Sequence, residues 1–107
     1  MHFLISQLED YKKRDNFPLK EWEKRGLHPS DEDVRQSMNL TVAAFADFLI
    51  DKISDRITEP AELQQEIQNY FDEHDNDDFD TEEREYIGDV QCKLIQLVGV
   101  DCSSLFI

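Results

Sequence analysis

The residues best suited to chemistry in this chain are the carboxylates between Asp72 and Glu85. This stretch, DEHDNDDFDTEERE, contains nine acidic side chains, one histidine and one arginine. Carboxylate oxygens bind hard cations such as Ca²⁺, and a dense group of carboxylates also attracts basic protein surfaces. The simplest alternative is a solvated connection that only keeps the protein soluble. These three possibilities frame the search for a function.

The spacing of the oxygen-bearing residues within the stretch is similar to that of a cation-binding loop. Counted from Asp72, positions 1, 3, 5, 7, 9 and 12 are Asp72, His74, Asn76, Asp78, Asp80 and Glu83, with helical patterns on both sides. This arrangement resembles an EF-hand calcium loop, in which Asp78 would bind through its backbone carbonyl. Two positions depart from that motif. Asp77 replaces the glycine of the sharp turn, and His74 is a poor ligand for a hard cation.

Other catalytic or cofactor-binding motifs are absent from the sequence. His2, His28 and His74 are far apart, and none lies one helical turn from another histidine or a cysteine, as a zinc site would favour. Three glycines cannot form a phosphate-binding loop, and no nucleophile elbow surrounds Ser103 and Ser104. We therefore expect neither an enzyme nor a bound cofactor, with Ca²⁺ as the alternative.

The charge of the chain limits its partners. The 107 residues have a net charge of −14, and residues 62–89 hold twelve acids and one base, which gives −11. Residues 1–28 hold five acids and six bases, a net charge of +1. Phosphates would be repelled, which argues against nucleic acids and anionic membranes, whereas a basic protein would be attracted.

The apolar periodicity predicts the elements that must position the acidic stretch. Helical spacing indicates helices over residues 2–15, 18–26, 31–56, 58–71 and 81–98. No strand alternation is present. We expect one domain over residues 1–107, an all-α compact bundle of four to five helices with the 31–56 helix at its centre.

Helix starts can be predicted from capping residues. Asp80 with Glu83 forms a capping box for the last helix, which explains both residues without a metal. Ser30 with Asp33 resembles a second box, and Thr58 is placed to cap the helix that contains Pro60.

The remaining apolar residues are expected in the core. Tyr11 and Trp22 belong to helical patterns, and Phe17 lies between them; aromatic residues at helical spacing pack in the core more often than they anchor a partner. Cys92 and Cys102 are expected as reduced thiols of a cytoplasmic protein, because no signal peptide or membrane-spanning stretch is present. The tail, Leu105 to Ile107, should pack on the domain or on a partner.

In size, charge and helical build, the chain resembles small bacterial immunity proteins, and the segment from Asp78 to Ile87 resembles small bacterial domains of unknown function. The resemblance implies an inhibitor that neutralises a basic toxin, with the oligomeric state left open. On this hypothesis, acidic and aromatic side chains together contact the partner: Asp72, Glu73, Asp75, Asp77, Asp78, Asp80, Tyr70, Phe79 and Tyr86. The alternatives are a calcium-binding helical module and a small structural or regulatory subunit.

Overall fold

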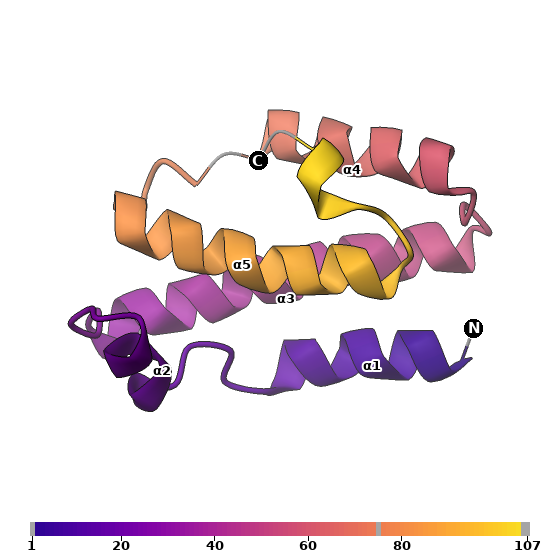
Figure 1. Cartoon of the computed structure of the whole chain (residues 1–107). Coiled ribbons are helices and arrows are strands. Elements are labelled where there is room, and N and C mark those ends of the chain that lie inside the picture. Colours follow the sequence, from indigo (N-terminus) through magenta and orange to yellow (C-terminus); the bar gives the residue numbers. More distant parts are fainter. Residues whose placement is uncertain (1, 75, 106–107) are drawn as a thin grey trace.

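The computed structural model describes residues 2–74 and 76–105, and all regular structure in these ranges is helical. The elements, in order, are α1 (His2–Lys13), α2 (Leu19–Lys24), α3 (Glu32–Ser54), α4 (Pro60–Glu73), α5 (Thr81–Leu97) and the 3₁₀ turn η1 (Cys102–Ser104). The all-α fold with one long helix is confirmed (Figure 1).

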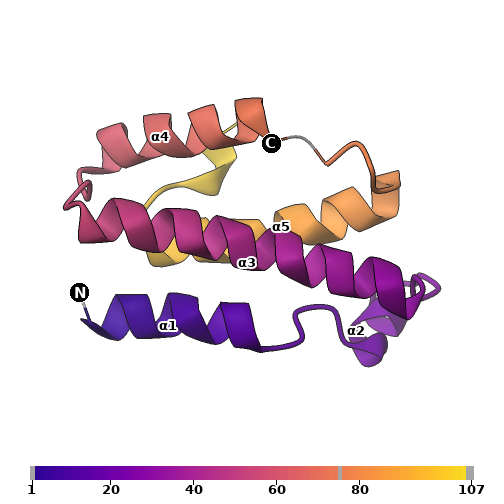
Figure 2. The same ribbon diagram turned by 180° about the vertical axis from the view of Figure 1, so that it is seen from behind.

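Helix α3 lies at the centre of the bundle. Both views show α1 along one side of α3 and α4 along the other, while α5 crosses its remaining face (Figures 1 and 2). The reason lies in the apolar stripe of α3, whose members recur every three or four residues and are fully or almost fully buried: Met38, Val42, Phe45, Ala46, Leu49 and Ile53. This stripe is the surface on which the other helices pack.

The aromatic residues of the N-terminal third belong to the core, as the sequence predicts. Phe17 and Trp22 are almost completely buried, and the indole Nε1 of Trp22 donates a hydrogen bond to the carbonyl of Phe17 at 3.1 Å. Both rings meet Tyr86 of α5 edge to face. Tyr11 is partly buried against the same core. These contacts fix α2 against the start of α5.

Asn39 ties the connection between α1 and α2 to the middle of α3. Its Oδ1 accepts a hydrogen bond from the backbone N–H of Asn16 at 2.9 Å, and its Nδ2 donates to Asp15 at 3.0 Å. An asparagine within a helix is a weak helix former, and here its amide holds a distant loop instead.

Helix α1 ends at Lys13, two residues before the predicted end.

Two of the three predicted caps are wrong. Asp31 and Glu59, rather than Ser30 and Thr58, stand at the N-caps of α3 and α4, and neither caps through its side chain. The Ser30 hydroxyl donates a hydrogen bond to the Glu83 carboxylate, and the charge of this acceptor strengthens the bond. The cap formed by Asp80 is confirmed.

The C-terminal segment turns back onto α5. Gly99, in the left-handed conformation with φ of 84°, ends the helix and reverses the chain. Cys102 then lies with its Cα 5.5 Å from that of Cys92, and the two form a disulfide bond. The prediction of reduced thiols is therefore wrong, because a spacing of ten residues does not reveal the turn that pairs them.

The tail was predicted to pack on the domain or on a partner, and the structure confirms this for one of its residues. Leu105 packs against the core, while Phe106 and Ile107 lie outside the described residues. No helix in the described ranges combines the length and the apolarity needed to cross a bilayer.

Candidate functional site

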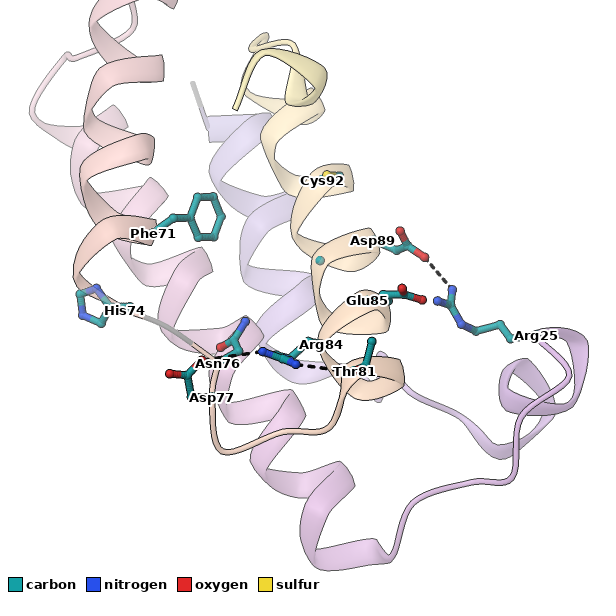
Figure 3. Close-up of a pocket in the computed structure, with 11 residues that line it drawn as sticks. Arg25, Phe71, His74, Asn76, Asp77, Thr81, Arg84, Glu85, Asp89 and Cys92 are labelled. Carbon is teal, nitrogen blue, oxygen red and sulfur yellow. Dashed lines mark hydrogen bonds and ion pairs between the residues drawn. The ribbon is translucent and has the colours of Figure 1, made fainter. Parts of the chain in front are cut away.

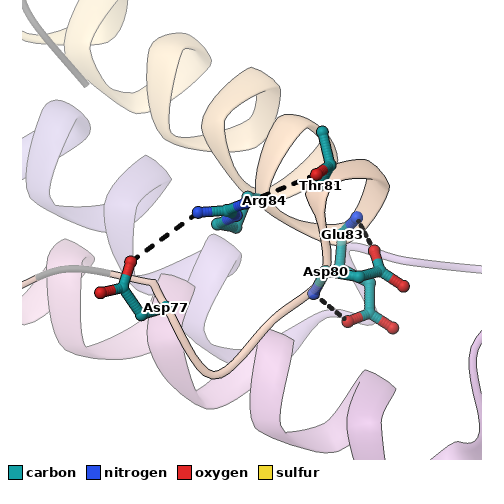
Figure 4. A network of polar contacts seen from close by, with 5 residues as sticks. All are labelled: Asp77, Asp80, Thr81, Glu83 and Arg84. Carbon is teal, nitrogen blue, oxygen red and sulfur yellow. Dashed lines mark hydrogen bonds and ion pairs between the residues drawn. The ribbon is translucent and has the colours of Figure 1, made fainter.

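The acidic connection between α4 and α5 is fixed at its C-terminal end by Asp80 and Glu83. The Glu83 N–H donates to Asp80 Oδ1 at 2.8 Å, and the Asp80 N–H donates to Glu83 Oε1 at 2.9 Å (Figure 4). The second oxygen of Glu83 accepts the Ser30 hydroxyl, which comes from the loop before α3. Glu83 is only 8% exposed. Through these hydrogen bonds, its carboxylate links the acidic connection and α5 to the loop before α3.

His74 is turned back on the last turn of α4. Its backbone N–H bonds to the carbonyl of Tyr70 at 2.9 Å, and its ring stacks on the Tyr70 ring with centroids 4.1 Å apart. The ring Nδ1 also lies 2.9 Å from the Tyr70 carbonyl oxygen. Tyr70 is half-buried, and this burial raises the pKa of its phenol. The start of the connection is therefore held by the aromatic end of α4.

Arg84 of α5 contacts the connection through Asp77. Its Nη1 lies 3.7 Å from Asp77 Oδ1, and its Nη2 lies 3.4 Å from the Thr81 hydroxyl (Figure 4). The Arg84 and Asp77 side chains are largely exposed, so water screens the ion pair and its contribution to stability is small.

The other predicted partner-binding residues differ in their exposure. Asp72, Glu73, Asp78 and Asp80 are exposed, while Phe79 is half-buried against the core. Asp75 lies outside the described residues.

The assignment of Tyr86 to a partner contact is wrong, because the side chain is 5% exposed between Phe17 and Trp22. The Arg25 guanidinium covers its ring at 4.4 Å. Burial is the main cause that raises the pKa of the Tyr86 phenol. Tyr86 belongs to the apolar stripe of α5, which the helical spacing of that segment already indicates.

A first groove, of about 610 Å³, runs between the end of α4 and α5 (Figure 3). Phe71, Gly88 and Cys92 are the least polar residues of its lining. Two arginines also line it, and each already faces a carboxylate: Arg25 Nη1 lies 2.7 Å from Asp89 Oδ2, and Arg84 pairs with Asp77. Both arginines of this groove are therefore already paired with carboxylates.

A second groove, of about 560 Å³, lies on the other side of the connection. It is bounded by α3, the end of α4 and the residues before α5. Its lining consists of Asp33, Val34, Ser37, Leu40, Thr41, Ala44, Tyr70, His74, Asn76, Asp78, Phe79 and Glu83. These residues include three carboxylates and no lysine or arginine.

The α3 wall of the second groove was not anticipated from the sequence. Leu40 belongs to that wall and is 71% exposed. The sequence contained one signal for this wall: Leu40 is an apolar residue that lies outside the buried stripe of α3. Periodicity shows that such a residue faces outward, but not which other element stands beside it.

The predicted calcium ligands are not assembled into a metal site. Among residues 2–74 and 76–105, no three His, Cys, Asp or Glu side chains are placed to hold one metal ion. Asp80 and Glu83 use their oxygens in the helix cap, and the His74 ring lies on Tyr70. An EF-hand geometry would require Glu83 to leave both the cap and Ser30.

Known proteins resemble the chain over almost its whole length. The model of one family, described as a domain of unknown function (DUF4844), matches residues 3–105. The crystal structure of a DUF3571 family protein from Acinetobacter baumannii AYE, at 28% sequence identity, has a TM-score of 0.77 and covers 96% of this chain and 83% of that one. No curated protein matches. Neither family description mentions immunity proteins or EF-hands.

Proposed function

Because the chain belongs to the DUF4844 family of domains of unknown function, we propose its role from the site itself: an acidic interaction module that binds a basic protein. One observation carries this proposal. Asp72 and Glu73 are exposed in the last turn of α4, and Asp78 is exposed on the connection that follows, whose two ends are fixed by His74 and by the Asp80–Glu83 cap. The carboxylates are thus presented to solvent from a supported backbone.

The electrostatics favour a protein over other partners. Residues 62–89 carry a net charge of −11, which repels phosphate groups and draws basic surfaces toward one part of the molecule. Such a field accelerates encounter more than it strengthens the final complex. The expected signature is a fast association rate that falls steeply as salt is added.

In its more specific form, the proposal is that the protein is an immunity-type inhibitor. Its partner would be a toxin, and the inhibitor would cover the active or substrate-binding surface of that toxin. Nuclease toxins expose basic surfaces because they hold a phosphate backbone, so an acidic helical inhibitor is complementary to them. The small size and the −14 charge support this form. Toxin activity measured with and without the protein tests it, and undiminished activity at saturating protein would overturn it.

Two variants of equal charge test the interaction module. The site variant combines Asp72→Asn, Glu73→Gln and Asp78→Asn; the control combines Asp10→Asn, Glu23→Gln and Asp55→Asn, which are exposed acids elsewhere. With a captured basic partner, we expect the site variant to slow association about tenfold and to flatten its salt dependence. Equal behaviour of the two variants would contradict the proposal. Salt-independent binding would favour a structural or regulatory subunit.

Calcium binding remains the other candidate function, and the engagement of Glu83 in the cap weighs against it. Melting in millimolar Ca²⁺ and then in Mg²⁺ at equal ionic strength decides the matter. A rise in melting temperature specific to Ca²⁺ would establish a metal site.

A cytoplasmic location belongs to the same proposal, although the Cys92–Cys102 bond weighs against it, because disulfides rarely persist in a reducing cytoplasm. Counting free thiols after rapid alkylation in cells tests it, and two oxidised cysteines would overturn it.

A further inference from the structure

We propose that the second groove receives an amphipathic helix of the basic partner, with apolar side chains against Leu40 and Phe79 and basic side chains at Asp33 and Asp78. This inference rests on the proposed function and adds to it the location of the contact and the chemistry of the bound segment. It also adds residues of α3, more than thirty positions earlier in the chain, to the acidic connection.

Leu40 is the first reason. Single exposed apolar residues are common, and Phe3 and Leu19 are also exposed, at 77% and 54%. Leu40 differs from them because it lines a groove together with other apolar side chains from three segments, namely Val34, Ala44, Tyr70 and Phe79. Phe3 and Leu19 line neither of the two grooves. Leu40 thus adds apolar surface where a concave site already exists.

The charge of the rim is the second reason. Asp33 comes from the first turn of α3 and Asp78 from the connection, so the two main walls each supply an exposed carboxylate. Within the part of the chain that the structure describes, no lysine or arginine lines this groove. The first groove differs, because Arg25 and Arg84 already pair with its acids. The second groove therefore offers the exposed carboxylates of Asp33 and Asp78 around an apolar floor.

These two properties select the occupant. An apolar floor takes the side chains that recur every three or four residues on one face of a helix, and an acidic rim takes the lysines or arginines that flank them. A second copy of the chain is disfavoured, because each copy carries a charge of −14 and repels the other. Nucleic acid is disfavoured for the same electrostatic reason.

A pair of synthetic peptides separates the groove from simple charge attraction. One peptide of roughly 18 residues places leucines on one helical face and lysines on the other, long enough to form a helix on the surface. The second has the same composition with the leucines dispersed around the helix. Affinities are measured by fluorescence anisotropy of labelled peptides, and the contact residues by amide chemical shifts of the intact protein.

We expect the amphipathic peptide to bind at least about tenfold more tightly than the dispersed one. The amide shifts should concentrate in residues 33–44 and 76–80. The Leu40→Ser variant should remove most of the tenfold difference, while the matched Leu19→Ser variant should retain it. Both leucines are exposed, so neither substitution removes a core contact.

The outcomes distinguish the two proposals. Equal affinities for both peptides, or shifts confined to the first groove, would overturn the groove inference and leave the acidic module standing. Failure of both peptides to bind would overturn the groove inference, whereas the acidic module is judged separately by the two charge variants and a captured basic partner. Self-association of the free protein through residues 33–44 would identify a second copy as the occupant and would also overturn the inference.

Discussion

Glu83 is the side chain on which the position of the acidic connection depends. One of its oxygens closes the capping box with Asp80, and the other accepts a hydrogen bond from Ser30. The capping box was predictable, because Asp and Glu three residues apart at a helix start form a local motif. The bond to Ser30 was not, because it joins residues 53 positions apart and depends on how α3 and α5 pack.

Removing the Glu83 carboxylate should therefore cost more than removing an exposed one. We expect Glu83→Ala to lower the free energy of unfolding by about 1–2 kcal/mol, since a cap and a partly buried hydrogen bond are lost. Glu82→Ala, at the exposed neighbouring position, should change it by less than about 0.5 kcal/mol. Urea denaturation of both variants provides the measurement. Similar losses for the two would show that the Glu83 contacts do not stabilise the fold.

The helices themselves were largely predictable, because their apolar stripes and terminal glycines are local signals. The start of α5 at Thr81 agrees with the prediction, and α1 and α4 each end two residues from their predicted ends. What the stripes do not encode is which faces meet. The second groove depends on the placement of α3 beside the connection, so its α3 wall could not be derived from periodicity.

Two glycines of the α5 region should respond oppositely to the same substitution. Gly88 lies in the helix interior and a Cβ there would meet no atom within 4 Å, whereas Gly99 has φ of 84°. We expect Gly88→Ala to raise the free energy of unfolding by about 0.5–1 kcal/mol, because alanine favours the helix. Gly99→Ala should lower it by about 1 kcal/mol or more, because alanine is strained at that φ.

Chemical denaturation of both glycine variants would check these signs. A loss of stability in Gly88→Ala would mean that the open space beside α5 is not available to a side chain.

At the scale of the whole molecule, the net charge of −14 opposes folding while it attracts basic partners. The intramolecular pairs of the basic N-terminal region offset only part of this repulsion. Lys12 lies 2.6 Å from Asp47, which raises the pKa of Lys12, and Arg25 pairs with Asp89. Among the described residues, Arg84 pairs with the acidic connection through Asp77, while residues 62–89 keep a net charge of −11, which concentrates the repulsion near the two grooves.

Salt should therefore stabilise the isolated protein. Raising NaCl from about 10 mM to about 500 mM shortens the screening length from about 30 Å to a few ångströms. If about 1 kcal/mol of repulsion is removed, the melting temperature rises by about 4–8 °C. The variant with Asp72→Asn, Glu73→Gln and Asp78→Asn should show a smaller rise. A melting temperature that falls with NaCl would contradict this account.

The disulfide between Cys92 and Cys102 closes a covalent ring that includes Lys93 and the turn at Gly99. Lys93 is exposed and lies inside the ring. A protease that cuts after Lys93 would open the backbone without releasing a fragment, since the bond between the sulfur atoms still holds both pieces. On a gel, the nicked chain would run as one band until a reducing agent separates it into two.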